Sequence, residues 1–296
     1  MIDANRFDDR PGSTDRTPVC ARNHDGNTAT NADNKAARRT ASCGIAIMAK
    51  ASAPGRTKTR LVPPLSFDEA AALNTAFLQD ISDNLLLAGR YAAIAGYAAY
   101  APPGSEDFFY RTLPSAIGLI DACLPNFGDC LLRTIEKVLA RGHGSAVVLN
   151  SDSPTLPTAL LVEAADALAQ PGERAVLGPS TDGGYYLLGV KTAHRRLFED
   201  IAWSTEHVAK QTLERAREIK LNVHTLPVWY DVDDVEGLRR LYGEVQRPRA
   251  SERSRQLDTR EPNHPAATAA LIGRLWANGE FTRRSENIMQ AAAQSA

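Results

Sequence analysis

A short segment near residue 50 combines the residue types that bind polyphosphates. Residues 44–60 read GIAIMAKASAPGRTKTR, an apolar run followed by a loop that contains Pro54 and Gly55. Four cations lie in or beside this loop: Lys50, Arg56, Lys58 and Arg60. Glycine lets a backbone approach its ligand, and lysine and arginine neutralise phosphate oxygens. The segment therefore predicts a strand that delivers a basic loop to a nucleotide, with Gly55 and the four cations contacting phosphate.

Two other interpretations of this loop are a Walker A P-loop and a solvated basic turn. A Walker A motif needs glycine, four residues, and then Gly-Lys-Ser/Thr. Here Lys58 follows Thr57, and Gly55 is the one nearby glycine, so the spacing fails. A solvated turn is the weaker interpretation, because the four cations fall within eleven residues at a predicted strand end.

Acidic residues follow three of the predicted strands. Asp152 comes directly after the apolar run AVVL, Asp182 lies in the segment GPSTDGGYY, and Asp231 and Asp233 follow the run NVHTLPV. Carboxylates at the carboxyl ends of parallel strands can hold Mg²⁺ against a nucleotide phosphate. Alternate residues of an extended segment point the same way, so Asp231 and Asp233 could both face a cation.

Each acidic segment also has a purely structural interpretation. Asp152 could cap the helix expected from Pro157 or form an Asx-turn. The Asp-Gly pair at 182–183 is a strong signal for a hairpin turn. Asp234 is well placed to cap the helix that follows it, which leaves Asp233 for a metal ion. The three segments considered together favour the functional interpretation.

Strand-like and helix-like runs alternate along the chain. The sequence predicts strands at 44–50, 91–100, 145–150, 175–178, 185–191 and 222–228. It predicts helices at 66–88, 128–141, 157–169, 205–220 and 235–245. Ser66 and Glu69 form a capping box at the start of the first helix. This alternation predicts an α/β fold, with a mostly parallel sheet and helices on both faces.

Composition divides the 296-residue chain into four parts. Residues 1–42 are a polar leader with almost nothing apolar to bury, and we expect them to be disordered. Residues 43–246 form the α/β domain, residues 247–264 a polar linker, and residues 265–296 a C-terminal helix and tail. The apolar positions of 266–277 suit one helix that docks on the domain or mediates self-association, and the sequence leaves both open.

Charge and apolar content exclude several classes of partner. The formal net charge is −1, so no overall field attracts nucleic acid or an anionic membrane. No run approaches the roughly 20 apolar residues of a membrane span, and the first residues lack the apolar core of a secretory signal. The four cysteines have no CxxC spacing and are expected to be reduced thiols in a cytoplasmic protein. His194, His207 and His224 lie in separate segments and are expected to be surface or capping residues.

Five motifs of the chain together resemble one protein family. They are AKASAPGRTKTRL at 49–61, NSDSPTL at 150–156, GPSTDGGYYLLG at 178–189, LFEDIAWST at 197–205 and DVDDVEGL at 231–238. In order and spacing they resemble DUF2064, a group of glycosyltransferase-like or CofC-like transferases. The resemblance covers residues 44–243. It implies a three-layer, Rossmann-like GT-A fold, the fold of nucleotide-diphospho-sugar transferases.

The resemblance also implies roles for individual residues. Lys58 and Arg60 would contact phosphates, and Asp152 and Asp233 would be the ligands of Mg²⁺ or Mn²⁺. The acceptor or sugar pocket would be lined by Asp182, Gly183, Gly184 and Tyr185. 

Two positions depart from the family pattern. Asn150 stands where the family more often has glycine, and Asp234 stands where threonine is usual. Neither departure removes one of the expected ligands.

A shared metal ion makes a geometric prediction. Asp152 and Asp233 are 81 positions apart in the sequence. To share one Mg²⁺, their carboxylates must come within roughly 5 Å of each other, and Lys58 should face the same crevice.

These observations predict a Mg²⁺-dependent nucleotidyltransferase that joins an NTP to a small phosphorylated acceptor and releases pyrophosphate. The main alternative is a GT-A glycosyltransferase that uses an NDP-sugar, with Asp182 as the base for the acceptor hydroxyl. A third hypothesis is a nucleotide-binding protein without turnover. Both enzyme hypotheses need a nucleotide and a small-molecule acceptor as partners.

Overall fold

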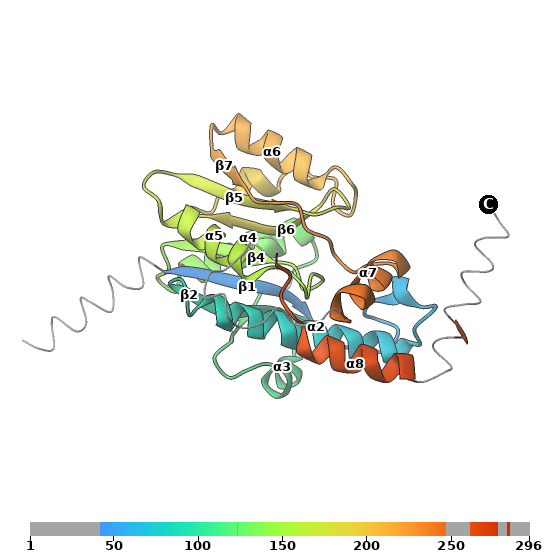
Figure 1. The fold of residues 1–296 in the computed structure, drawn as a ribbon. Coiled ribbons are helices and arrows are strands. Elements are labelled where there is room, and N and C mark those ends of the chain that lie inside the picture. Colours follow the sequence, from blue (N-terminus) through green and yellow to red (C-terminus); the bar gives the residue numbers. More distant parts are fainter. Residues whose placement is uncertain (1–41, 123, 247–260, 278–282, 285–296) are drawn as a thin grey trace, which may run out of the picture.

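The computed structural model describes residues 42–122, 124–246, 261–277 and 283–284. The predicted leader, apart from Ser42, lies outside these residues, as do 247–260 of the predicted linker and most of the tail. Within the described residues, one sheet is flanked by helices (Figure 1). None of the helices in this part of the chain is long and apolar enough to cross a membrane.

Seven strands form the sheet in the order β3-β2-β1-β4-β6-β5-β7. Their bounds are β1 (Cys43–Lys50), β2 (Ile94–Ala101), β3 (Gly118–Asp121), β4 (Ser145–Leu149), β5 (Arg174–Pro179), β6 (Tyr185–Val190) and β7 (Asn222–Thr225). Neighbouring strands run parallel except that β6 is antiparallel to both β4 and β5. The predicted α/β class with a mostly parallel sheet is confirmed.

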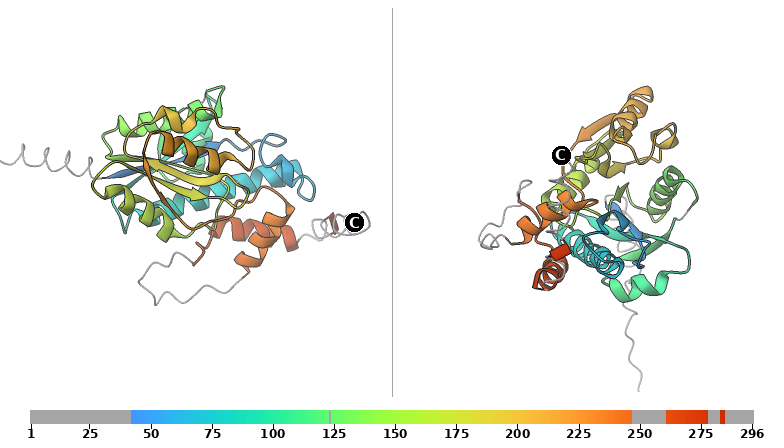
Figure 2. Two further views of the ribbon diagram at one scale, coloured as in Figure 1. Left: turned by 90° about the horizontal axis from the view of Figure 1, so that it is seen from above. Right: turned by 90° about the vertical axis from the view of Figure 1, so that its right-hand side faces the viewer.

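Helices cover both faces of this sheet, as the two views of Figure 2 show. On one face lie α2 (Phe67–Ala88) and α5 (Thr158–Ala169), and on the other lie α4 (Phe127–Leu139) and α6 (Val208–Glu218). The central strand β1 contributes Ile45 and Ile47 to the first core and Ala46 to the second. Successive side chains of a strand point to opposite faces, so an uninterrupted apolar run is what a strand buried on both sides requires.

A third core joins the C-terminal helices to α2. Here α7 (Val235–Val245) and α8 (Ala266–Ala277) pack against the N-terminal half of α2, with Leu271, Ile272 and Leu275 of α8 buried. The carboxylate of Asp80 on α2 accepts the backbone N–H groups of Ala267 (2.8 Å) and Thr268 (2.7 Å). The apolar face of α8 is therefore docked on the same chain.

Several elements differ from the predicted ones for local reasons. The structure adds β3, α3 (Glu106–Thr112) and the short 3₁₀ helices η1 (Thr59–Leu61) and η2 (Arg195–Phe198), all too short to show a clear period. Strand β7 ends three residues before its predicted end, ahead of Pro227, which has no N–H for a ladder. The capping box is confirmed, because the Ser66 hydroxyl accepts the Glu69 N–H and the Glu69 carboxylate accepts the Ser66 N–H.

Candidate functional site

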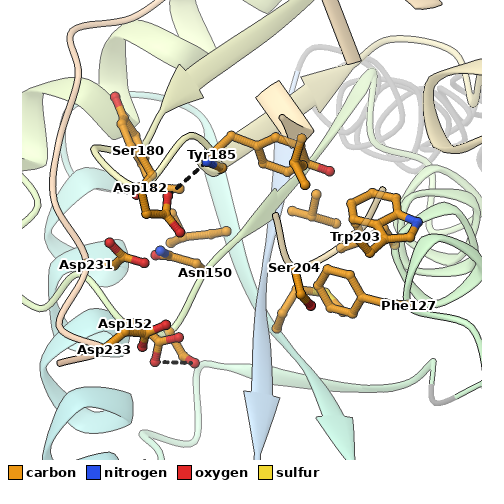
Figure 3. A pocket seen from close by; sticks show the side chains of 18 of the residues that line it. Phe127, Asn150, Asp152, Ser180, Asp182, Tyr185, Trp203, Ser204, Asp231 and Asp233 are labelled. Carbon is orange, nitrogen blue, oxygen red and sulfur yellow. Dashed lines mark hydrogen bonds between the residues drawn. The ribbon is translucent and has the colours of Figure 1, made fainter. Parts of the chain in front are cut away.

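A cavity of about 550 Å³ opens at the carboxyl ends of β1 and β4. Its floor includes Met48 of β1, Val148 and Leu149 of β4, and Tyr185 at the start of β6. The chain leaves β1 for β2 on one side, whereas β4 lies on the other side, so the sheet order reverses here. Ligands of open α/β sheets bind at such switch points. The cavity is therefore where this fold places a ligand (Figure 3).

Beside this cavity, one lysine joins the two aspartates that the sequence predicted as metal ligands. The Lys58 ammonium lies 2.6 Å from Asp152 Oδ1 and 2.9 Å from Asp233 Oδ1, and it donates to the Val232 carbonyl at 2.9 Å. The Asp152 carbonyl also accepts the Val232 N–H at 2.9 Å, which ties the two acidic loops together. Because both carboxylates bond to the same nitrogen, they are close neighbours, as a shared cation would require.

Lys58 is buried in this position and bonded to three acceptors. Its side chain is 6% exposed, against 31% for Asp152 and 40% for Asp233. Its backbone has a φ of 52°, a left-handed conformation at the start of η1 that aims the side chain inward. Burial by itself would lower the pKa of Lys58, but the two adjacent carboxylates outweigh it and leave that pKa raised. The ammonium therefore stays charged and offers its three N–H groups to three acceptors.

The other residues of the predicted phosphate loop lie at different depths. Arg60 lines the cavity with a 74% exposed side chain, and its guanidinium is 3.7 Å from Asp233 Oδ2. Lys50 instead donates to the Arg56 carbonyl at 2.8 Å, a hydrogen bond that joins the two ends of the loop. Gly55 has a φ of 71°, which suits a turn in this loop, and neither Gly55 nor Arg56 lines the cavity. Phosphate contact by this loop stays a prediction.

The segment after β5 is both a hairpin turn and a wall of the cavity. Asp182 accepts the Gly184 N–H at 2.9 Å, and both residues line the cavity together with Tyr185. Gly183 has a φ of 87°, and a Cβ there would lie 2.1 Å from the carbonyl oxygen of Glu206. The close backbone approach that the paired glycines indicated is therefore made to residues just before α6. The pocket role of this segment stays a prediction.

Asp231 adds a further carboxylate to the same cavity. Burial, followed by the nearby charges of Asp182, Asp233 and Asp152, raises the pKa of Asp231 to about 6. Its neighbour Asp234 points away and caps α7 by accepting the Gly237 N–H at 2.8 Å, as predicted. Asp231 is thus a buried carboxyl group that lies close to three other carboxylates.

The donor set fits a divalent cation that is shared with a phosphate. Among the described residues, no group of three His, Cys, Asp or Glu side chains is arranged to hold a metal ion alone. Mg²⁺, however, is usually held by one or two carboxylates, with water and substrate phosphates completing its shell. The pKa of Asp231 is raised first by burial and then by nearby negative charge, and a cation would compensate the second of these. Asp152 and Asp233 are the carboxylates placed for that role.

Some residues of the cavity carry no sequence prediction. Phe127 at the start of α4 and Trp203 before α6 line the side opposite the aspartates (Figure 3). Three lining atoms are buried without a hydrogen-bond partner in the described part of the chain: Asn150 Oδ1, Ser180 Oγ and the Tyr185 hydroxyl. Trp203 lies within the motif LFEDIAWST, which was the one available signal for it.

Residues 87–205 match the model of the family DUF2064, described as "Uncharacterized protein conserved in bacteria". The predicted resemblance to this family is confirmed over these residues, which lie within the predicted range 44–243. The chain is also similar to a putative nucleotide-diphospho-sugar transferase from Desulfovibrio desulfuricans G20, with 27% identity and a TM-score of 0.66. That match covers 82% of this chain and 98% of the other. The predicted GT-A type of fold is confirmed with it.

Two further solved structures share less of the geometry. A cytidylyltransferase from Leptospira borgpetersenii has 13% identity and a TM-score of 0.46, covering 81% of this chain and 96% of the other. A CMP:2-keto-3-deoxy-manno-octonic acid synthetase complexed with CTP has 13% identity and a TM-score of 0.44, covering 68% and 96%. No curated protein is significantly similar to the chain.

Proposed function

We propose that this protein is a Mg²⁺-dependent, nucleotide-utilising transferase, and specifically a nucleotidyltransferase. It would join an NTP to a small phosphorylated acceptor and release pyrophosphate. One observation carries the proposal: the Lys58 ammonium lies between Asp152 and Asp233 at the edge of the switch-point cavity. The similarity to the D. desulfuricans transferase supports the use of a nucleotide.

In this proposal the chain's own residues bind and orient a triphosphate. Asp152 and Asp233 hold Mg²⁺ or Mn²⁺, and when bound this ion polarises and neutralises phosphoryl oxygens. Arg60, exposed at the cavity, is free to turn toward the departing pyrophosphate. Lys58 brings a second positive charge to the same place, because its ammonium lies beside both metal-binding carboxylates.

The attacking group needs no protein base in this reaction. A phosphate on the acceptor is already anionic, so positioning and charge stabilisation supply most of the catalysis. No described histidine lines the cavity. His194 and His224 are paired with Glu173 and Glu163 away from the cavity. His207 is paired with Glu206, which lines the cavity although the histidine does not.

The reaction is tested by its leaving group. The full chain is incubated with Mg²⁺, a small-molecule cell extract, and either the four NTPs or a set of NDP-sugars. Release of pyrophosphate supports the proposal. Lys58→Ala should then lower turnover on the order of a hundredfold, as the loss of a charge-stabilising donor does. Lys210→Ala, an exposed lysine on α6, is the matched control. Full turnover by Lys58→Ala would contradict the proposal.

A glycosyltransferase that uses an NDP-sugar is the second candidate. It is favoured by the position of Asp182, which lines the cavity and could take the proton of an acceptor hydroxyl. Release of a nucleoside diphosphate, abolished in Asp182→Asn, would establish this reaction in place of nucleotidyl transfer. Tight nucleotide binding whose affinity is the same with and without EDTA, together with no turnover of any substrate, would instead establish a binding protein.

A further inference from the structure

The cavity has two chemically different ends. Asp152, Asp182, Asp231 and Asp233 lie on one side of Figure 3, and Phe127 and Trp203 lie on the other. The ring of Tyr185 extends from the start of β6 toward Trp203. We call Phe127, Trp203 and Tyr185 the aromatic end. Proposed phosphate and metal binding uses the acidic end and leaves Phe127 and Trp203 of the aromatic end without a role.

The rings of the aromatic end are held in place before any ligand arrives. Phe127 meets Trp203 edge to face, with centroids 5.3 Å apart and planes at 84°. The indole also lies close against Gly128, where a Cβ would be 3.0 Å from its Nε1 atom. Ser204, the next residue, has a φ of 64°, a conformation that non-glycine residues rarely adopt. Backbone strain of this kind concentrates at ligand sites.

This end also offers one polar group without a partner among the described residues, the Tyr185 hydroxyl, beside an exposed ring. Phe127 is 51% exposed, so its ring is available for contact. The Tyr185 hydroxyl is buried and has no hydrogen-bond partner in the described part of the chain. Burial raises the pKa of Tyr185, so the hydroxyl keeps its proton as a donor. Buried polar groups are nearly always paired, so this hydroxyl is available to donate to a water molecule or a ligand group in the cavity.

The charge of the lining restricts what can bind there. Five carboxylates line the cavity: Asp152, Asp182, Glu206, Asp231 and Asp233. Arg60 is the one basic residue among the described residues of the lining. Away from Arg60 and Lys58, an anionic ligand would meet repulsion without a compensating cation. The group that fills the aromatic end therefore carries no negative charge.

The in-line geometry of phosphoryl transfer decides which of the two substrates lies at the aromatic end. In phosphoryl transfer, the attacking and leaving oxygens lie roughly in line with the reacting phosphorus. With the leaving pyrophosphate at Lys58 and Arg60, the attacking group must come from the opposite side, toward Phe127 and Trp203. We propose that the aromatic end binds the body of the acceptor, a ring that bears hydroxyl groups and no negative charge. This assignment rests on the proposed function. Such a ring would stack its apolar face on Phe127 and Trp203. One of its hydroxyl groups would accept a hydrogen bond from the Tyr185 hydroxyl.

Ligand-observed NMR tests this inference without knowledge of the true acceptor. The probes are the methyl glycosides of glucose, galactose, mannose and xylose, each added to the full chain with Mg²⁺. We expect saturation transfer to at least one of them. Phe127→Ala and Tyr185→Phe should each weaken its binding by about three- to tenfold, the usual contribution of an aromatic contact or a hydrogen bond. Tyr110→Ala, an exposed aromatic residue on α3 away from the cavity, is the matched control and should change nothing.

Nucleotide binding is measured on the same variants with the four NTPs and Mg²⁺. Unchanged nucleotide binding in Phe127→Ala and Tyr185→Phe supports the acceptor site. Loss of nucleotide binding in these variants would overturn it, because the aromatic end would then hold the base. Absence of saturation transfer to all four glycosides would also overturn it. If glycosides bind and no nucleotide does, the ring site stands while the proposed transferase function fails.

Discussion

Replacing Lys58 by methionine should destabilise the protein mainly through the loss of its positive charge. Methionine fills similar space but leaves Asp152 and Asp233 adjacent without their shared cation, and the Val232 carbonyl without its donor. Removing one partner of a fully buried ion pair costs about 3–5 kcal/mol. The two carboxylates are 31% and 40% exposed, so water recovers part of this. We therefore expect Lys58→Met to lower the free energy of unfolding by about 2 kcal/mol.

Urea unfolding of a set of variants isolates the charge effect. The set is Lys58→Met, the double variant Asp152→Asn/Asp233→Asn, and the triple variant that combines them. In the asparagine background no carboxylate is left uncompensated, so Lys58→Met should cost much less there. Lys210→Met is the control and should change stability by less than about 0.5 kcal/mol. An equal cost of Lys58→Met in both backgrounds would refute the ion-pair reasoning.

Three further predictions follow from single contacts. Asp80→Ala should lower the free energy of unfolding by about 1–2 kcal/mol and expose α8 to limited proteolysis, because the first N–H groups of that helix lose their acceptor. Gly183→Ala should cost at least about 2 kcal/mol in urea unfolding because of its φ of 87° and its backbone clash, whereas Gly243→Ala in open space on α7 should stabilise by up to about 1 kcal/mol. Asp233→Asn should lower kcat by about a hundredfold or more, whereas Asp234→Asn should keep both kcat and stability, because asparagine caps a helix as well as aspartate does.

The sheet was predictable because its strands carry a strong local signal. The apolar runs at β1 and β4 are buried on both faces, and such short uninterrupted runs could be recognised without tertiary information. The edge strand β3 has four residues and α3 has seven, so neither contains enough of a period to be recognised. The type of each long element could be predicted from its local sequence pattern. Short elements such as β3 and α3 form because of the neighbours that they pack against, and local sequence does not contain that information.

The acidic end of the cavity was predictable for a topological reason. Parallel strands deliver their carboxyl ends to one edge of the sheet, so Asp152 and Asp233 could both be placed at that edge. Their close contact does not follow from strand order, because β6 and β5 lie between β4 and β7. The segment after β7 instead runs back to Asp152, where the Val232 N–H donates to the Asp152 carbonyl. The direct contact of Lys58 with both aspartates was not predicted. It depends on the left-handed backbone at Lys58, which no sequence pattern of a lysine indicates. Of the aromatic end, Tyr185 was predicted, whereas Phe127 and Trp203 were missed. Phe127 starts α4 and Trp203 lies in the loop before α6, and each by itself is typical of an ordinary packing residue.

The Lys58 contact also links the binding of a cation to the binding of a nucleotide. A divalent cation at Asp152 and Asp233 must compete with the Lys58 ammonium for the same two oxygens. A nucleotide phosphate at this edge would offer the ammonium a new acceptor and so remove the competition. Linkage is reciprocal, so Mg²⁺ should bind more tightly when the nucleotide is present, and the nucleotide more tightly with Mg²⁺.

In Lys58→Met the competition is absent, so Mg²⁺ alone should raise the urea midpoint of this variant more than that of the unmodified chain. The effect of nucleotide on Mg²⁺ affinity, measured by calorimetric titration, should shrink in the same variant. Equal stabilisation of both proteins by Mg²⁺ would mean that the ammonium and the cation do not share their oxygens. The two aspartates would then serve Lys58 alone, as a structural anchor for the loop after β1.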